Sequence, residues 1–265
     1  ELEVSRDGRF LRCSNRGHDS VVTYAIDPAS GRLCTAGWTA TGGAEPRFVG
    51  SDPAGRFFYA ANQNSHSIVV FAIDAANGKQ KWVFDPAAHQ TGAIGRRQRG
   101  VVYWASGDDR RIFTGAGTYL YALDAATGKL IPSFGANGRI HLGEGVADPA
   151  PVVQINTPGV IYKDMYIVGG QTNGPGTIRA YDVRMGKMRW MFRLIPRPGE
   201  TGYETWPPEA YKTAGGASNW SGLSLDERRG IVYVPTESAL PDFWGGDRAG
   251  ANLFANSLVA LDAAT

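Results

Sequence analysis

The sequence is poor in cysteine and histidine. It has 2 cysteines and no Cys-x-x-Cys spacing, which excludes a disulfide framework and a metal or redox motif of that type. The 4 histidines stand far apart in turn-like contexts, so we predict no metal site from them: His18, His66, His89 and His141.

Long apolar runs and an excess of one charge are also missing. The longest apolar stretches are short strand-like pieces such as residues 67–73, so the sequence predicts no transmembrane helix. The formal net charge is +2, and we expect neither nucleic acid nor a membrane as a partner. Residues 1–10 lack the pattern of a signal peptide, and the host compartment stays unknown.

Turn-forming residues are abundant. The chain has 35 glycines and 15 prolines, together with 43% hydrophobic and 20% charged residues. This composition is typical of a soluble globular protein with many tight turns. At 265 residues, the chain is long enough to bury a sizeable core.

One sequence motif recurs five times: a short strand-like segment that ends in aspartate. In four copies a glycine follows four residues later. The aspartates are separated by 47, 50, 58 and 80 residues: Asp27, Asp74, Asp124, Asp182 and Asp262. A repeat of about 50 residues is typical of a four-stranded propeller blade.

We therefore predict an all-β fold, a single β-propeller domain over residues 1–265 with about five four-stranded blades. The outer strand of the third blade is assigned to residues 130–134. The fifth blade lacks its outer strand, since the chain ends at Thr265. An edge-to-edge homodimer through that open edge is an alternative to closing the ring by side-chain packing.

Local chemistry supports the repeat. The aspartate accepts hydrogen bonds from the following turn, and the glycine supplies the positive φ that the reversal needs. Trp82 and Trp190, on outer strands, are expected to lie flat between neighbouring blades. Cys13 and Cys34 fall on the second and fourth strands of the first blade. Two strand spacings of about 4.8 Å separate them, so we predict free thiols.

Residues 1 to about 74 resemble the lactonase family of seven-bladed propellers, the 6-phosphogluconolactonase-like group. Residues 7–27 and 54–74 carry this resemblance and align at a constant offset of 47 residues. Family members often have a histidine after a Pro-Arg pair, where this chain has Phe48. Two of seven blades do not complete the central pocket of that family.

From about residue 75 to residue 265 the chain is similar to pyrroloquinoline-quinone (PQQ) dehydrogenases. The segments "RRQRGVVYW", "INTPGVIYKDMYIVGG" and "SNWSGLSLDERRGIVYVPTESALPDFWGG" carry this resemblance. The nearest types are the eight-bladed quinoprotein glucose and alcohol dehydrogenases, whose members are periplasmic. The change between families falls inside one blade, because the outer strand with Trp82 is already of the quinoprotein type.

The resemblance implies four cofactor-binding residues. Arg99 matches an arginine that contacts the quinone, although the basic cluster of Arg96, Arg97 and Arg99 also fits a solvated loop. Trp220 matches the tryptophan on which the cofactor stacks, with a core tryptophan between blades as the alternative. Asn173 stands in place of a calcium-ligating carboxylate, and Ser238 in place of an asparagine near cofactor and metal.

The family's catalytic aspartate follows the phrase with which this chain ends, so we assign no catalytic residue and no metal ligand. We predict an engineered or chimeric propeller scaffold without retained catalytic activity and with no cofactor. The alternative is a truncated PQQ-dependent sugar or alcohol dehydrogenase that still binds the quinone, with calcium. A lactonase-type hydrolase is a third hypothesis.

Overall fold

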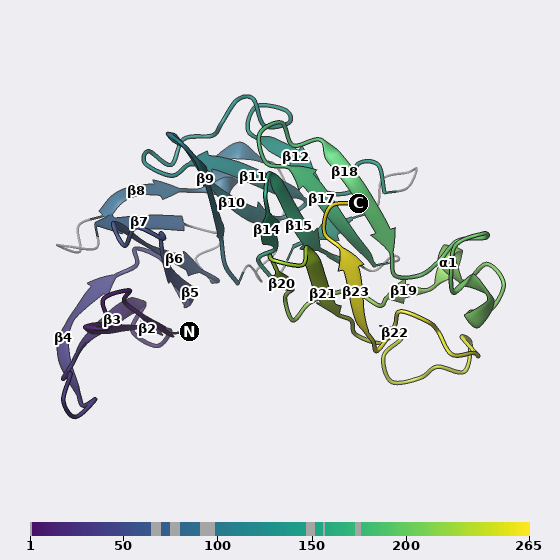
Figure 1. Ribbon diagram of the computed structural model, residues 1–265, viewed down its shortest axis with the longest axis horizontal. Coiled ribbons are helices and arrows are strands. Elements are labelled where there is room, and N and C mark those ends of the chain that lie inside the picture. Colours follow the sequence, from purple (N-terminus) through teal and green to yellow (C-terminus); the bar gives the residue numbers. More distant parts are fainter. Residues whose placement is uncertain are drawn as a thin grey trace. The chain divides into compact units, whose positions relative to one another are not determined.

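The computed structural model describes residues 2–64, 70–74, 80–90, 99–146, 152–155, 157–172 and 176–265. The chain forms two compact units: residues 1–116 with 122–131, and residues 117–121 with 132–265. Antiparallel strands dominate both units (Figure 1). The helical elements are short: η1 (Pro86–His89), η2 (Tyr203–Thr205) and α1 (Ala210–Thr213). The all-β prediction is confirmed.

Two four-stranded meanders open the chain, in which each strand pairs with the next in sequence. The first contains β1 (Leu2–Val4), β2 (Phe10–Asn15), β3 (Ser20–Ile26) and β4 (Leu33–Ala40). The second contains β5 (Pro46–Ser51), β6 (Phe57–Asn62), β7 (Val70–Asp74) and β8 (Gln80–Phe84). Cys13 lies on β2 and Cys34 on β4, as predicted, and both are free thiols.

The third sheet departs from the prediction at its outer strand. It contains β9 (Val102–Ser106), β10 (Asp109–Ala116), β11 (Tyr119–Asp124) and β12 (Arg139–His141). The assignment of residues 130–134 as that strand is wrong: they make one bridge, from Leu130 to Leu123, and then a turn. Pro132 has no N–H for a ladder, and Gly135 adopts a φ of +54°, so the chain reverses before β12.

The second unit continues with a four-stranded and a three-stranded sheet. The former contains β14 (Val160–Tyr162), β15 (Met165–Gly169), β17 (Thr177–Asp182) and β18 (Met188–Arg193). The latter contains β20 (Ser224–Asp226), β21 (Ile231–Pro235) and β23 (Leu258–Asp262). Two-residue ladders join β13 (Val153–Gln154) to β16 (Gln171–Thr172) and β19 (Gly215–Gly216) to β22 (Ala239–Leu240). The count of five blades and a homodimer through β23 stay predictions.

The recurring aspartate closes the turn after the third strand of a sheet. Asp27 Oδ1 accepts from the Ser30 N–H at 2.7 Å and from its hydroxyl at 2.8 Å. Asp124 Oδ1 accepts from the Thr127 N–H at 2.8 Å and from its hydroxyl at 2.7 Å. Gly128 has a φ of +71°, which confirms why glycine stands four residues after the aspartate.

Both predicted tryptophans dock onto the turn of the following repeat. Trp82 Nε1 donates to the Ala125 carbonyl at 3.2 Å, and a Cβ on Gly128 would lie 2.4 Å from the Trp82 ring. Trp190 Nε1 donates to the Ala263 carbonyl at 3.3 Å. One outer strand is therefore anchored on the next sheet by ring packing and one hydrogen bond.

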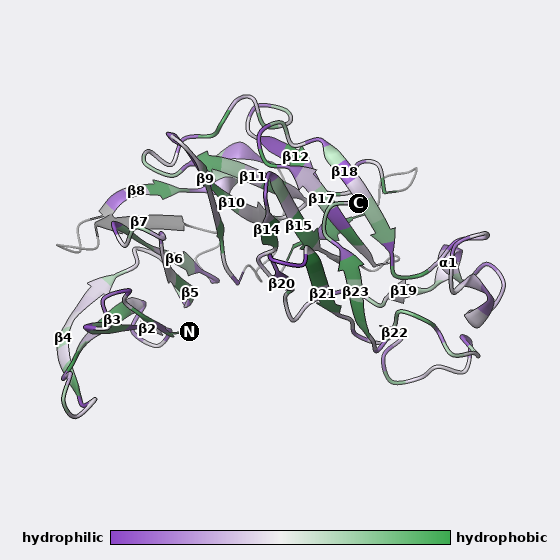
Figure 2. Ribbon diagram, in the orientation of Figure 1, coloured by the Kyte–Doolittle hydropathy of each residue, from purple (hydrophilic) through white to green (hydrophobic). Residues whose placement is uncertain are grey.

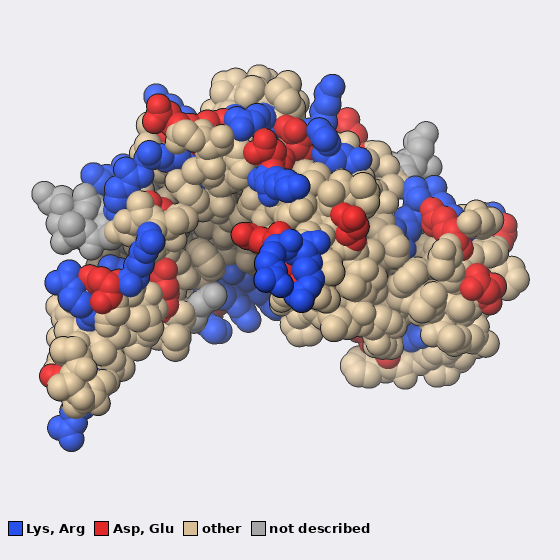
Figure 3. Space-filling model, in the orientation of Figure 1, with Lys and Arg blue, Asp and Glu red and all other residues tan. Residues whose placement is uncertain are grey.

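The core of the second unit is built from the central strands. Ile167, Ile178, Val232 and Val234 are fully buried in one cluster, and Figure 2 shows hydrophobic residues along β15 and β21. Basic and acidic side chains are interspersed over the face drawn in Figure 3. Within the described ranges we find no helix with the length and apolar character needed to cross a membrane.

Candidate functional site

A short antiparallel ladder in the second unit brings together two segments that the sequence singled out. β19 pairs with β22, and the ladder continues beyond both strands. The Ala217 N–H donates to the Ser238 carbonyl at 3.1 Å, and the Glu237 N–H donates to the Ser218 carbonyl at 3.0 Å. Gly216 is required here because its φ is +69° and a Cβ would lie 2.9 Å from a backbone nitrogen of β22.

The ladder carries two of the four predicted site residues. Trp220 follows Ser218 in one segment, and 45% of its surface is exposed, against 8% for the docked Trp82. Trp220 is therefore partly accessible to solvent. Ser238 is half-buried in the other segment, and its hydroxyl accepts a hydrogen bond from Arg248 Nη2 at 3.1 Å. The fold thus places Trp220 and Ser238 on paired segments.

The other two predicted residues are not joined to this pair. Arg99 is half-buried in the first compact unit, and its grouping with Trp220 stays a prediction. Asn173 lies outside the described residues, as do Arg96 and Arg97 of the basic cluster.

Glu237 is a site residue that the sequence reasoning missed. Its Oε1 accepts a short hydrogen bond from the hydroxyl of the fully buried Ser218. Glu237 is itself half-buried, and no basic side chain of the described part of the chain pairs with it. Ser218 and Glu237 are 19 residues apart, and only the ladder brings them together. No sequence motif could have revealed this pair.

Asn219 packs on the opposite side, toward β15. Its Nδ2 donates to the carbonyls of Gly222 at 2.8 Å and Pro235 at 2.7 Å. Its Oδ1 is buried and accepts no hydrogen bond. A Cβ on Gly169 would lie 3.2 Å from that oxygen, so glycine at the end of β15 leaves the room that the amide occupies.

Arg179, in the middle of β17, is the largest fully buried side chain of the described residues. Its Nη1 donates to the Leu142 carbonyl and to the Tyr181 hydroxyl, while Nε and Nη2 have no acceptor. Burial raises the pKa of Tyr181, and Arg179 opposes that shift only in part. The phenol therefore stays neutral and does not balance the guanidinium charge.

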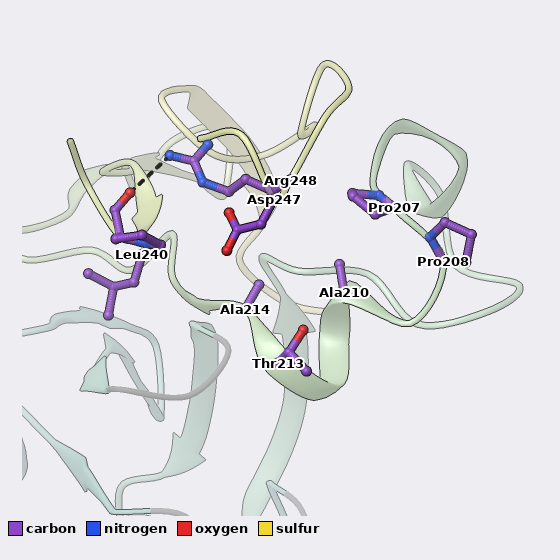
Figure 4. Close-up of a pocket in the computed structure, with 9 residues that line it drawn as sticks. Pro207, Pro208, Ala210, Thr213, Ala214, Leu240, Asp247 and Arg248 are labelled. Atoms are coloured by element: carbon purple, nitrogen blue, oxygen red, sulfur yellow. Dashed lines mark hydrogen bonds between the residues drawn. The ribbon is translucent and has the colours of Figure 1, made fainter. Parts of the chain in front are cut away.

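A pocket of about 180 Å³ adjoins the Ser238 end of the ladder. Figure 4 shows the carboxylate of Asp247 among Ala214, Thr213 and Leu240 in its wall. Arg248 lines the same pocket and links it to Ser238. This volume is below the roughly 300 Å³ at which typical ligand pockets begin, so we do not assign a large planar cofactor to it.

Comparison with known proteins decides the family. Residues 52–265 match the sequence model of the glucose/ethanol/alcohol dehydrogenase β-propeller domain, the PQQ family. The chain belongs to this family. Residues 1–94 match the lactonase 7-bladed β-propeller, and the two matches overlap over residues 52–94. Both predicted resemblances are confirmed, with an overlap in place of a single change near residue 74.

Curated relatives of this PQQ-family chain are quinone-linked dehydrogenases. The quinate/shikimate dehydrogenase (quinone) of Acinetobacter baylyi is 35% identical over 167 residues, which are 59% of this chain and 20% of that protein. Quinoprotein glucose dehydrogenase A of Acinetobacter calcoaceticus is 30% identical over 217 residues, 71% of this chain and 27% of the relative. The chain thus spans roughly a fifth to a quarter of these relatives' length.

A solved structure of a quinohemoprotein dehydrogenase is also similar to this chain. The quinohemoprotein alcohol dehydrogenase ADHIIG of Pseudomonas putida HK5 superposes with a TM-score of 0.62 at 25% identity, covering 79% of this chain and 31% of that one. BamB of Moraxella catarrhalis, at 12% identity and a TM-score of 0.51, shares the fold alone.

These matches correct two predictions. The hypothesis of a non-catalytic scaffold is wrong, because the family and the curated relatives are PQQ-dependent dehydrogenases. The expectation of no cofactor is wrong for the same reason. Both predictions rested on the aspartate motif of the family, whereas the family match covers strands and loops over residues 52–265. The designed origin remains a prediction.

Proposed function

We propose that this chain contributes the cofactor-binding face of a PQQ-dependent dehydrogenase that oxidises a hydroxyl group of a sugar, polyol or related polyhydroxy compound. The observation that carries the proposal is the family match over residues 52–265, which includes both segments of the ladder. Relatives are named for glucose, glycerol and quinate or shikimate, which all carry oxidisable hydroxyl groups. The match also spans both compact units, which supports a single propeller domain.

The second unit offers the kinds of group that fit a planar quinone bearing carboxylates. The exposed indole of Trp220 provides an apolar face for stacking. Arg179 holds a guanidinium with two unused donors, which suits a carboxylate. Asn219 Oδ1, which accepts no hydrogen bond, is an oxygen ligand of the type that Ca²⁺ prefers. PQQ, when bound, supplies the electron sink for the oxidation.

Oxidation of a hydroxyl group releases its proton, and Glu237 is the residue of the ladder suited to accept it. The Ser218 hydroxyl fixes Oε1, whereas Oε2 has no hydrogen-bond partner among the described residues. Oε2 is therefore the oxygen at which Glu237 would take up the proton of the substrate hydroxyl. Ser218 acts as a positioning residue, because its hydroxyl holds the carboxylate in one orientation.

Cofactor uptake and turnover test this proposal. The chain is incubated with PQQ and Ca²⁺, freed of excess cofactor and examined by absorbance and tryptophan fluorescence. Dye reduction is then measured with glucose, glycerol, ethanol and quinate. We expect stoichiometric uptake, quenching that W220F reduces, and dye reduction with at least one polyhydroxy substrate. Failure of the wild-type chain to retain PQQ at any Ca²⁺ concentration contradicts the proposal.

The role of Glu237 has its own control. E237Q keeps the size of the side chain and removes the proton acceptor, so we expect dye reduction to fall by about 10²-fold or more with PQQ still retained. The exposed Glu204 in η2 gives the matched control, and E204Q is expected to match wild type. Equal rates in E237Q and E204Q remove Glu237 from the mechanism.

A further inference from the structure

Arg179 is unusual because a charged side chain is fully enclosed without a counter-charge. None of its surface is exposed, and its Nη1 bonds only neutral oxygens, the Leu142 carbonyl and the Tyr181 hydroxyl at 2.9 Å. The guanidinium also lies 5.8 Å from the centre of the Tyr181 ring. No carboxylate of the described residues forms an ion pair with it. Burying an unpaired charge destabilises the folded protein unless a ligand supplies the opposite charge.

The unused donors are the pair that a carboxylate requires. Nε and Nη2 point from the same edge of the guanidinium and have no acceptor. Two parallel N–H groups on one edge match the two oxygens of a carboxylate in a bidentate arrangement. Since the bonds of Nη1 fix the plane of the group, the free edge has a defined orientation.

The backbone around this edge is shaped for close approach. A Cβ on Gly170 would lie 3.0 Å from Arg179 Nη2 and 2.7 Å from Val153 Cγ1, so only glycine fits between them. Val153 belongs to β13, which is held to β16 by two residue pairs. The ladder beside the free edge is therefore much shorter than the five-residue pairing of β15 with β17.

We propose that the Nε–Nη2 edge of Arg179 binds a carboxylate group, and that in the working protein this is a carboxylate of the quinone cofactor. This assignment rests on the proposed function for the identity of the ligand, while the carboxylate chemistry follows from the guanidinium itself. Arg179 is thus an anchor for one end of the cofactor.

The test compares R179M and R179K with wild type by PQQ binding and by the melting temperature of the cofactor-free chain. We expect R179M to weaken PQQ binding by about 10- to 100-fold, as expected for a lost charge-assisted pair. The PQQ affinity of R179K is expected to lie between those of wild type and R179M, because an ammonium group cannot bind both carboxylate oxygens in the way a guanidinium does. The cofactor-free R179M is expected to melt no lower than wild type, since an uncompensated charge is removed.

Arg193 gives the matched control, because its Nη1 pairs with Glu200 at 2.6 Å on the neighbouring strand β18. R193M is expected to leave PQQ affinity unchanged. A purely structural role for Arg179 predicts the opposite pattern, with a lower melting temperature for cofactor-free R179M and an unchanged dissociation constant for PQQ. That pattern overturns the proposal.

Acetate separates this inference from the proposed function. We expect millimolar acetate, against chloride at equal ionic strength, to raise the melting temperature of wild type by roughly 2–4 °C and to leave R179M unchanged. If wild type binds no PQQ but responds to acetate through Arg179, the proposed function fails and the carboxylate site stands. If neither acetate nor PQQ acts through Arg179, the carboxylate site is refuted.

Discussion

Sheet β1–β4 meets sheet β5–β8 through a small apolar cluster, in which Val21 packs against Val49, Phe58 and Ala60, and through polar contacts beside it. Glu3 accepts from the Ser51 N–H at 2.8 Å and from its hydroxyl at 2.9 Å, and the Arg12 guanidinium lies 5.0 Å from the centre of the Phe58 ring. Sheets of the quinoprotein type are instead anchored by a tryptophan on a glycine turn, as Trp82 shows. At the position of Trp82, eight residues after the turn aspartate, the first sheet has Thr35.

This difference shows that one blade pattern accommodates two kinds of interface. Trp38 is the tryptophan of β4, and it is 60% exposed. The first sheet therefore has an aromatic outer strand without the docking contact. The presence of a tryptophan does not create the interface; its register relative to the aspartate turn does.

The largest effect is expected from removing the docked ring. W82A should lower the free energy of unfolding by about 3–5 kcal/mol, because a large buried side chain and its hydrogen bond to Ala125 are lost. W38A, in the exposed position, should change it by about 0.5 kcal/mol or less. Urea denaturation followed by circular dichroism measures both. Equal losses in the two variants contradict the distinction between the interfaces.

A smaller effect is expected from the turn glycine beneath the ring. G128A adds a Cβ that meets the Trp82 ring at 2.4 Å, in addition to the strain of a φ of +71°. G31A, with a φ of +69° and nothing within 4 Å, carries the strain alone. We expect a loss of about 1 kcal/mol for G31A and about 2–3 kcal/mol for G128A. Thermal melts of both variants give the difference, and a similar loss in each rules out tight ring packing.

The polar interface of the first sheet should respond less. E3Q keeps the shape of the side chain but removes its charge, and we expect a loss of about 1 kcal/mol because two hydrogen bonds to Ser51 are no longer charge-assisted. Glu45 is also half-buried, and no described residue donates a hydrogen bond to its carboxylate, so E45Q provides the control. Chemical denaturation with no difference between E3Q and E45Q means that packing alone holds this interface.

The smallest effect concerns the aspartate turns. The Ser30 hydroxyl and backbone N–H groups lower the pKa of Asp27 in the turn after β3, and the Arg229 side chain lowers the pKa of Asp226 in the turn between β20 and β21. Because these folded-state values lie below the unfolded value of about 3.9, the stabilisation is present above that pH and is lost as the pH falls through the folded pKa. D27N keeps Oδ1 as acceptor, so its melting temperature should fall less between pH 5 and pH 2 than that of wild type. An identical fall in both proteins shows that Asp27 does not contribute to the loss of stability at low pH.

Features encoded within a few residues could be predicted from the sequence. The aspartate and glycine turns and the docking of Trp82 depend on local spacing, and the strands follow from alternation. The outer strand of the third sheet was misplaced because residues 130–134 look extended although Pro132 and Gly135 turn the chain. The predicted pair of Trp220 and Ser238 came from the family resemblance.

The pairings that define the site's chemistry depend on distant residues. Glu237 is held in place by the hydrogen bond from Ser218 across the ladder. A glutamate in a polar segment gives no indication in the sequence that such a contact will form. Arg179 resembles any arginine on an alternating strand, and its enclosure follows from Leu142 and Gly170 packing around it. Long-range packing of this kind is not readable from one sequence.

The aspartate turn also acts as an interchangeable joint between third and fourth strands. The turn at Asp27 and the turn at Asp124 use the same hydrogen bonds, although one lies in the lactonase-like part of the chain and the other in the quinoprotein part. A chain can therefore leave a third strand of one lineage and continue as a fourth strand of the other without losing register. β7 and β8, in which Ala72 lies opposite Trp82, fall within residues 52–94, the stretch that both family models match. Because of this turn, segments shorter than a whole blade can be exchanged between such proteins.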